Sequence, residues 1–254
     1  MHTVTVRNVT IGEGIPKICV PVVGITKKEI KEQAELAKQS GADLVEWRAD
    51  WFADVCEPQS VAEVLKELRG TLGELPLLFT FRTKREGGER ELSLNAYLAL
   101  NEAAARSGLV DLVDIELFAG DECVKRLVET SHSYGVKVVA SNHDFQKTPA
   151  KDEIIKRLCR MQELGVDIVK IAVMPESRAD VLMLLAATEE MCREYARCPV
   201  ITMSMGSDGV LSRLCGELTG CAVTFGAVGK VSAPGQVQAQ ELAAVLRLLH
   251  QSML

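Results

Sequence analysis

Short runs rich in β-branched residues recur along this chain at nearly regular intervals, and this period limits the possible folds more than any other feature. Most of the runs are apolar throughout, which is typical of strands that are buried on both faces. The stretches between them are long enough for one crossover helix each, as in parallel βα units. The runs are spaced about 29 residues apart on average and begin at Lys17, Asp43, Pro76, Asp111, Val136, Val166, Pro199 and Ala222.

The segments between these runs carry helix start and stop signals. Thr26 and Glu29 have the spacing of a capping box, and we expect the helix that they open to stop at Gly41. Thr148 followed by Pro149 predicts another helix start. An apolar stripe in the segment 178–195 predicts a buried side made of Val181, Leu182, Leu184, Leu185 and Met191. Further helices are expected near 93–107, 121–134 and 236–252.

Eight strand–helix units in 254 residues predict an α/β fold, a single (β/α)8 TIM barrel domain over residues 1–254. Residues 3–14 alternate in polarity and predict a short N-terminal β-hairpin that closes the bottom of the barrel. The alternative is an open, doubly wound sheet, which usually carries a Gly-x-Gly-x-x-Gly motif after its first strand. Val22–Thr26 follows the first strand here and lacks that motif.

Composition narrows the class of protein and of partner. Hydrophobic residues make up 47% of the chain, which excludes disorder. The net charge is −6 with no Lys/Arg cluster, so we expect neither nucleic acid nor an anionic membrane as a partner. The start of the chain does not resemble a signal peptide, and no apolar stretch is long enough for a membrane span. We therefore expect a cytoplasmic protein.

The 8 cysteines and 4 histidines are scattered, and no Cys-x-x-Cys pair occurs. Several cysteines lie within apolar runs, which is typical of reduced, buried thiols. A structural zinc site needs clustered ligands. We therefore expect neither disulfides nor a metal site.

In a barrel of this type, working residues stand at the carboxyl ends of the strands. Lys170 is the most informative of them, because it lies inside the apolar run Ile168–Ala172. Burial favours the neutral amine, which is the nucleophilic form of lysine. The alternative interpretation is a structural ion pair with a core carboxylate such as Glu116. Lys17 and Lys137 flank strand starts, the stability end of a barrel, and are interpreted as structural.

His143 ends the strand that precedes the one with Lys170, so the two should be neighbours. A histidine with a pKa near neutrality can remove a proton and return it. Glu86 follows the third strand and can hold the imidazole in one orientation. Alone, either residue is more often structural or solvated than catalytic.

Three arginines, Arg48, Arg82 and Arg213, are predicted at the same mouth. Glu46 shares a strand face with Arg48, because residues two apart point the same way. Arginine binds carboxylates through two parallel hydrogen bonds, so we expect a small acidic, hydroxylated substrate. The short glycine pattern of Gly226–Lys230 is only a weak indication of a phosphate-binding loop.

Together these residues resemble the type I 3-dehydroquinate dehydratase family over about residues 4–250. The matching motifs are Glu46-Trp47-Arg48, Phe79-Thr80-Phe81-Arg82, Glu86-Gly87-Gly88, Ser141-Asn142-His143-Asp144-Phe145, Lys170-Ile171-Ala172, Ile201-Thr202-Met203-Ser204-Met205-Gly206 and Ser232-Ala233-Pro234-Gly235-Gln236. The first strand ends with Pro21, where some members have a serine, so the resemblance supports no substrate contact there.

The resemblance implies a lyase of the shikimate pathway, which leads to aromatic amino acids. Water is eliminated in the syn sense from 3-dehydroquinate to give 3-dehydroshikimate, with Lys170 as the imine lysine and His143 as the proton donor and acceptor. It also implies a homodimer, and no metal or organic cofactor because the lysine is the electron sink. In the remaining implied roles, Glu86 orients His143; Glu46, Arg48 and Arg82 hold ring hydroxyls; Arg213 holds the carboxylate; and Ser232 and Gln236 belong to a loop that closes over the site.

Two alternatives remain at this point. Another lysine-imine barrel, such as a class I aldolase or transaldolase, would act mostly on phosphorylated sugars. A non-catalytic barrel that binds a carboxylate metabolite would need neither Lys170 nor His143 as reactive groups. The reaction itself does not distinguish a biosynthetic role from quinate breakdown.

Overall fold

The predicted strands form the inner ring of a barrel in the computed structural model, which describes residues 2–229 and 234–254. Within these residues, eight parallel strands pair in chain order around the ring. They are β3 (Lys17–Val22), β4 (Leu44–Arg48), β5 (Leu77–Thr80), β6 (Leu112–Glu116), β7 (Lys137–Asp144), β8 (Ile168–Val173), β9 (Val200–Ser204) and β10 (Val223–Ala227).

The ring closes between β9 and the chain that enters β10. Val200 and Cys221 form a parallel bridge, and the Ala222 N–H donates to the Val200 carbonyl at 2.8 Å. A two-residue strand, β11 (Val237–Gln238), pairs in parallel with the last two residues of β10. The predicted TIM barrel is thereby confirmed, and the open doubly wound alternative is wrong.

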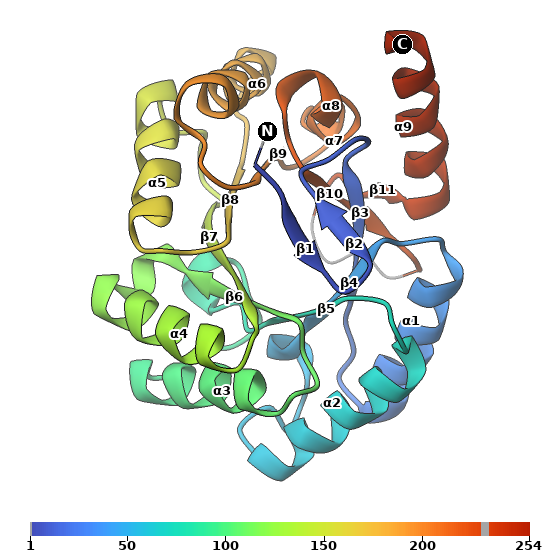
Figure 1. Ribbon diagram of the computed structural model, residues 1–254, viewed down its shortest axis with the longest axis vertical. Coiled ribbons are helices and arrows are strands. Elements are labelled where there is room, and N and C mark those ends of the chain that lie inside the picture. The colour runs from blue at the N-terminus through green and yellow to red at the C-terminus, as the bar shows by residue number, and fades with distance from the viewer. Residues whose placement is uncertain (1, 230–233) are drawn as a thin grey trace.

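Helices surround the ring, as Figure 1 shows. Within the described residues, no helix is both long and apolar enough to cross a bilayer. The α-helices are α1 (Lys27–Gln39), α2 (Pro58–Leu72), α3 (Leu94–Arg106), α4 (Asp121–Ser133), α5 (Lys151–Glu163), α6 (Arg178–Glu190), α7 (Val210–Leu214), α8 (Gly216–Thr219) and α9 (Ala239–Met253). Shorter turns are η1 (Ala49–Trp51), η2 (Lys84–Glu86), η3 (Leu117–Ala119) and η4 (Met191–Tyr195).

Two predicted helix details are wrong and one is confirmed. The capping box of Thr26 and Glu29 is present, and Gly41 follows the end of α1 with φ +80°. Helix α5 begins at Lys151 rather than beside Thr148, because the Thr148 hydroxyl donates instead to the Met174 carbonyl. Leu182 is 62% exposed, so the buried stripe of α6 is narrower than its leucines suggest.

The strands separate two apolar layers. Side chains that alternate along each strand pack outward against the helices or inward into the barrel. On β8, Val169, Ile171 and Val173 belong to the outer layer, whereas Ile168 and Ala172 belong to the inner one. Lys170 therefore lies on the inner face of the strand.

The bottom of the barrel is closed by the hairpin of β1 (Val4–Val6) and β2 (Val9–Ile11), which crosses the ring in Figure 1. Val6 and Ile11 are buried in the inner layer with Leu44, Leu78 and Leu112. The position of this hairpin agrees with the prediction from the sequence.

Ile11→Ala is expected to lower the free energy of unfolding by about 2–5 kcal/mol, because it leaves a cavity in the bottom layer. Urea denaturation measures the change. Thr5→Ala, at an exposed position of the same hairpin, serves as the control and should stay within about 0.5 kcal/mol of the unaltered chain. Equal effects of the two substitutions would show that the hairpin does not complete the core.

Candidate active site

A cavity opens at the carboxyl ends of the strands, where the sequence placed the working residues. It brings together the predicted residues Glu46, Arg48, Arg82, Glu86, His143, Lys170, Arg213 and Gln236. Ser232, the remaining predicted residue, lies outside the described residues. The other lining residues are Gly87, Phe145, Ala172, Met203, Met205 and Phe225.

Lys170 rises from β8 between Ile168 below and Ala172 above, and its side chain is almost fully buried. Its Nζ lies 3.5 Å from Asp114 Oδ2 and 3.6 Å from Glu46 Oε1. The Phe225 ring covers it at 4.4 Å from Nζ to the centroid. The alternative interpretation, an ion pair with a core carboxylate, is therefore met by Glu46 and Asp114. Glu116, the example expected from the sequence, accepts instead from Arg82 and Thr83.

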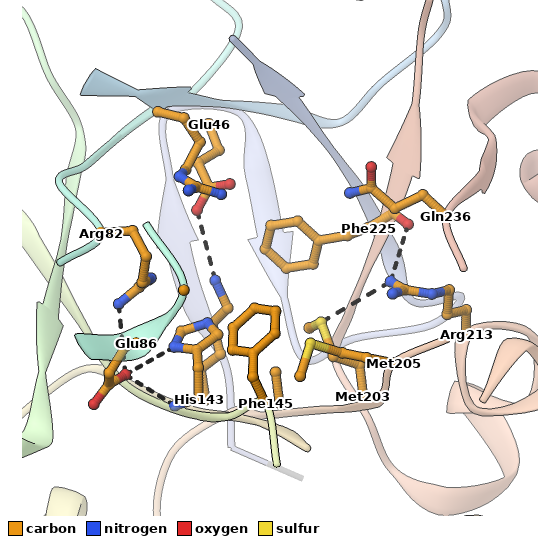
Figure 2. A pocket seen from close by; sticks show the side chains of 14 residues that line it. Glu46, Arg82, Glu86, His143, Phe145, Met203, Met205, Arg213, Phe225 and Gln236 are labelled. Carbon is orange, nitrogen blue, oxygen red and sulfur yellow. Dashed lines mark hydrogen bonds and ion pairs between the residues drawn. The ribbon is translucent and has the colours of Figure 1, made fainter. Parts of the chain in front are cut away.

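His143 and Glu86 point toward each other at the side of the cavity away from Arg213 (Figure 2). Nδ1 of His143 lies 3.0 Å from Glu86 Oε2, and the His143 backbone N–H donates to the same oxygen at 2.9 Å. Burial lowers the pKa of His143 well below its usual value, and the positive charges of Arg82 and Lys170 lower it further. The imidazole is therefore neutral at pH 7 and able to accept a proton.

Glu86 reaches His143 because of the two glycines that follow it. Gly87 has φ +83°, and a Cβ there would lie 2.1 Å from the Phe145 ring. A Cβ on Gly88 would lie 1.9 Å from the Arg82 carbonyl oxygen. The motif Glu86-Gly87-Gly88 thus permits a close approach of η2 to the ends of β5 and β7. Burial raises the pKa of Glu86 to about 8, although Arg82 opposes the shift.

Arg82 lies at the centre of a buried charge network. Its guanidinium donates to Asp114 at 2.7 Å, to Ser141 at 2.9 Å and to Glu116 at 3.0 Å. Glu86 lies 3.9 Å away. The side chain faces the cavity, but these partners occupy most of its donors.

Arg48 is held by a residue that the sequence analysis did not single out. Both oxygens of Asp50 accept from Arg48 at 2.8 Å, and Asp50 also accepts from the backbone of Arg82 and Glu89. The signal was available, because Asp50 follows Arg48 by two residues. Asp114 was also missed as a site residue, although it lies two residues before Glu116 on the same strand, β6.

Arg213 is a buried guanidinium that no carboxylate of the described residues neutralises. Its polar contacts are the carbonyls of Phe225 and Pro234 at 3.5 and 3.1 Å, and Met203 Sδ at 3.9 Å. Burial lowers the pKa of Arg213 to about 10. In Figure 2 it lies beside Gln236 and next to Met203 and Met205. This end of the cavity suits an anion.

Pro21 on β3 lies in register with Glu46 and is not among the residues that line the cavity. Within the described chain, no group of three or more His, Cys, Asp or Glu side chains is arranged to hold a metal ion.

The family model described as type I 3-dehydroquinase matches residues 18–253 of this chain. The chain belongs to the type I 3-dehydroquinase family. It is 55% identical over 250 residues to the 3-dehydroquinate dehydratase of Clostridioides difficile (strain 630), a match that covers 98% of each protein. The 3-dehydroquinate dehydratase of Salmonella paratyphi B is 53% identical over 252 residues, 99% of this chain and 100% of that relative.

Solved structures of the type I family match the fold as well. A crystal structure of type I 3-dehydroquinate dehydratase from Clostridium difficile, with covalent modified comenic acid, has a TM-score of 0.97 and 55% identity. The match covers 99% of this chain and 100% of that chain. These matches confirm the family and the hydro-lyase activity that the sequence predicted, for which a Schiff base is characteristic.

His143 is expected to remain mostly uncharged at pH 6.5, because its pKa lies well below that value. As Glu86 ionises near pH 8, its carboxylate should draw the imidazole proton to Nδ1. Nitrogen-15 NMR of the imidazole, assigned with His143→Gln, measures both effects. Glu86→Gln should lose the change of tautomer near pH 8. If this variant still shows that change, ionisation of Glu86 is not its cause.

Proposed function

We propose that Lys170 is the residue that forms the imine in the dehydration of 3-dehydroquinate to 3-dehydroshikimate. The observation that supports this most strongly is the geometry of one cavity. It combines a buried lysine, a neutral His143 held by Glu86, and a buried Arg213 that no carboxylate of the described residues neutralises. Each part of the reaction needs one of these groups. The substrate is a β-hydroxy ketone that bears a carboxylate.

The first steps create an electron sink. The ammonium of Lys170 gives up one proton, and the resulting amine adds to the C3 carbonyl carbon. The carbonyl oxygen then leaves as water, with that proton and a second one from the nitrogen. The resulting protonated imine withdraws electrons from C2 and makes the C2 proton acidic. The cation is the nitrogen of the lysine itself, so the proposal requires neither a metal nor an organic cofactor.

His143 then serves as both base and acid. Because Nδ1 faces Glu86, Nε2 is the ring nitrogen that takes the C2 proton when the carboxylate is ionised. The enamine expels the C1 hydroxyl, which receives a proton from His143 and departs as water. One group that acts on one face produces a syn elimination. Water finally hydrolyses the imine, releases the product and restores Lys170.

The remaining residues are proposed to position the substrate. Arg213 binds the carboxylate, while Glu46, Arg48 and Arg82 hold ring hydroxyls. Gln236 lines the cavity, and the Pro234 carbonyl accepts from Arg213 and from the Gly206 N–H. With Ser232, these residues are proposed to form a loop that closes over bound substrate and excludes water from the imine.

The two earlier alternatives have less support. An aldolase-like imine enzyme would act mostly on phosphorylated sugars, whereas the buried cation in this cavity stands beside apolar side chains and suits one carboxylate. A binding protein would not require a neutral imidazole beside a buried lysine. Borohydride trapping combined with a turnover assay distinguishes the three functions. A dehydratase gives an adduct with 3-dehydroquinate and turns it over, whereas an aldolase-like enzyme or a binding protein does not turn it over.

We also propose a cytoplasmic homodimer in which residues 1–254 act as one domain. All 8 cysteines are free thiols, as expected in a reducing compartment. The family resemblance supports the dimer. Light scattering coupled to gel filtration tests it, because a monomer has a mass of 27.7 kDa.

Borohydride added with 3-dehydroquinate should fix a covalent adduct on the peptide that contains Lys170. Lys170→Ala should lose both the adduct and essentially all turnover, because the described residues that line the cavity include no other lysine. Peptide mass spectrometry and product absorbance measure the two results. Lys137→Ala, at the opposite end of the neighbouring strand, is the control; an adduct on any lysine but Lys170 would make the assignment wrong.

His143→Ala is expected to reduce kcat by about 10²–10⁴-fold, because one group handles the proton in several steps. The affinity for substrate should change far less. Initial rates and equilibrium binding measure the two effects, and His132→Ala, at the bottom of the barrel, is the control. A variant that keeps a tenth of the turnover would remove His143 from the mechanism.

Arg213→Gln is expected to lower kcat/KM by about 10–150-fold, mostly through KM, because a charge-assisted hydrogen bond to the carboxylate is lost. Arg160→Gln, at an exposed position of helix α5, is the control. The inhibition constants of quinate and of its carboxamide give a second measurement. The unaltered chain should prefer the acid and Arg213→Gln should not; an unchanged preference would place the carboxylate elsewhere.

A further inference from the structure

Asp114 is buried beneath the cavity and contacts Lys170 from the side that the substrate cannot reach. It is 0% exposed, and it is not among the residues that line the cavity. Its Oδ1 accepts from Arg82 at 2.7 Å and from Ser141 at 2.6 Å. Its Oδ2 has no hydrogen-bond partner within the described chain, and lies 3.5 Å from Lys170 Nζ.

We propose that Asp114 is a positioning residue that acts through Lys170, as the buried counter-ion of the protonated imine. The proposal rests on the imine role of Lys170 given above. When a lysine ammonium and a ketone form a protonated imine, two protons leave with the carbonyl oxygen as water. The positive charge stays on the same nitrogen, so one fixed carboxylate can stabilise it before and after the step.

Glu46 is the other carboxylate near Nζ, and it is less suited to this role. Its Oε1 lies 3.6 Å from Nζ and accepts from the Thr80 hydroxyl at 2.9 Å. Glu46 lines the cavity, so a bound substrate can hydrogen-bond to it and draw it away from the imine. Asp114 is shielded from substrate and solvent, and its attraction for Nζ is therefore screened less.

The surroundings of Asp114 keep it ionised. Burial alone would raise the pKa of Asp114, but Arg82 and Lys170 outweigh burial and hold the pKa below its usual value. Two hydrogen bonds fix Oδ1 and leave Oδ2 directed at the lysine. The titratable groups that face Lys170 from the packed strands are Cys19 on β3, Glu46 on β4, Asp114 on β6 and His143 on β7.

Reduction of the imine by two hydride donors tests the proposal. Cyanoborohydride transfers hydride to the carbon of protonated imines only, whereas borohydride also reduces neutral ones. The ratio of the two trapping rates, measured against pH by intact-protein mass, gives the pH at which half of the imine is protonated. For Asp114→Asn we expect this midpoint to fall by about 1–3 pH units, the effect of losing an opposite charge at this distance.

Glu116→Gln is the matched control. Glu116 also neutralises Arg82, at 3.0 Å, and no ion pair joins it to Lys170 in the described chain. The Glu116→Gln variant should have the same midpoint of imine protonation as the unaltered protein. In Asp114→Asn, kcat should fall more at pH 8 than at pH 6 while KM changes little, because the substrate does not contact Asp114. If Asp114 were merely structural, kcat of Asp114→Asn would be reduced to the same extent at pH 6 and at pH 8.

Asp114→Asn leaves Arg82 less neutralised and can fail to fold. Two double variants then provide the same comparison, because each removes one positive and one negative charge. They are Arg82→Gln/Asp114→Asn and Arg82→Gln/Glu116→Gln. A lower midpoint only in the variant without Asp114 supports the proposal, and equal midpoints overturn it. If the unaltered protein gives no adduct with either reagent, the imine role of Lys170 fails instead, so the two failures are distinguishable.

Discussion

The placement of one buried cation, Arg82, fixes the arrangement of most other charges in this barrel. It lies two residues after the end of β5 and reaches carboxylates on β6 and a hydroxyl on β7. Desolvation makes such a network a poor source of net stability, but removing one partner leaves a buried charge uncompensated, at a cost of about 3–5 kcal/mol. The network therefore holds neighbouring strand ends in one register, and with them Asp114 and Glu86.

The three arginines of the cavity differ in what surrounds them rather than in their chemistry. Arg82 is surrounded by carboxylates, and Arg48 is clamped by Asp50. Arg213 alone among the three stands without an ion-pair partner in the described residues, at the end lined by methionines and Phe225. Charges that are already paired help to shape the cavity, whereas an unpaired buried cation is available to a ligand. Such a fixed distribution of charge is the basis of electrostatic preorganisation.

The barrel divides its two ends between stability and chemistry. The bottom layer consists of apolar side chains from the hairpin and from the starts of several strands. The upper layers replace them with Glu46, Asp114 and Lys170, which cost desolvation energy. The large apolar layer between strands and helices offsets that cost, because it buries side chains from every part of the ring. A reactive lysine can therefore be kept inside a stable core.

The sequence by itself determined the period of the fold, the strand-end positions of the site and the family. A repeat of about 29 residues leaves little choice but parallel βα units, and parallel strands bring their carboxyl ends to one face. Eight of the nine predicted site residues consequently line one cavity. Only the tertiary structure decided the partners: Asp114 and Glu46 rather than Glu116 beside Lys170, and, among the described residues, no carboxylate on Arg213. The ion pairs of Lys170 join separate strands, and which of several buried carboxylates meets which cation depends on distances of a few ångströms. Tertiary structure also decided the outcome at Leu182 and Thr148. Packing leaves Leu182 exposed, and the Thr148 hydroxyl donates to the Met174 carbonyl just after β8.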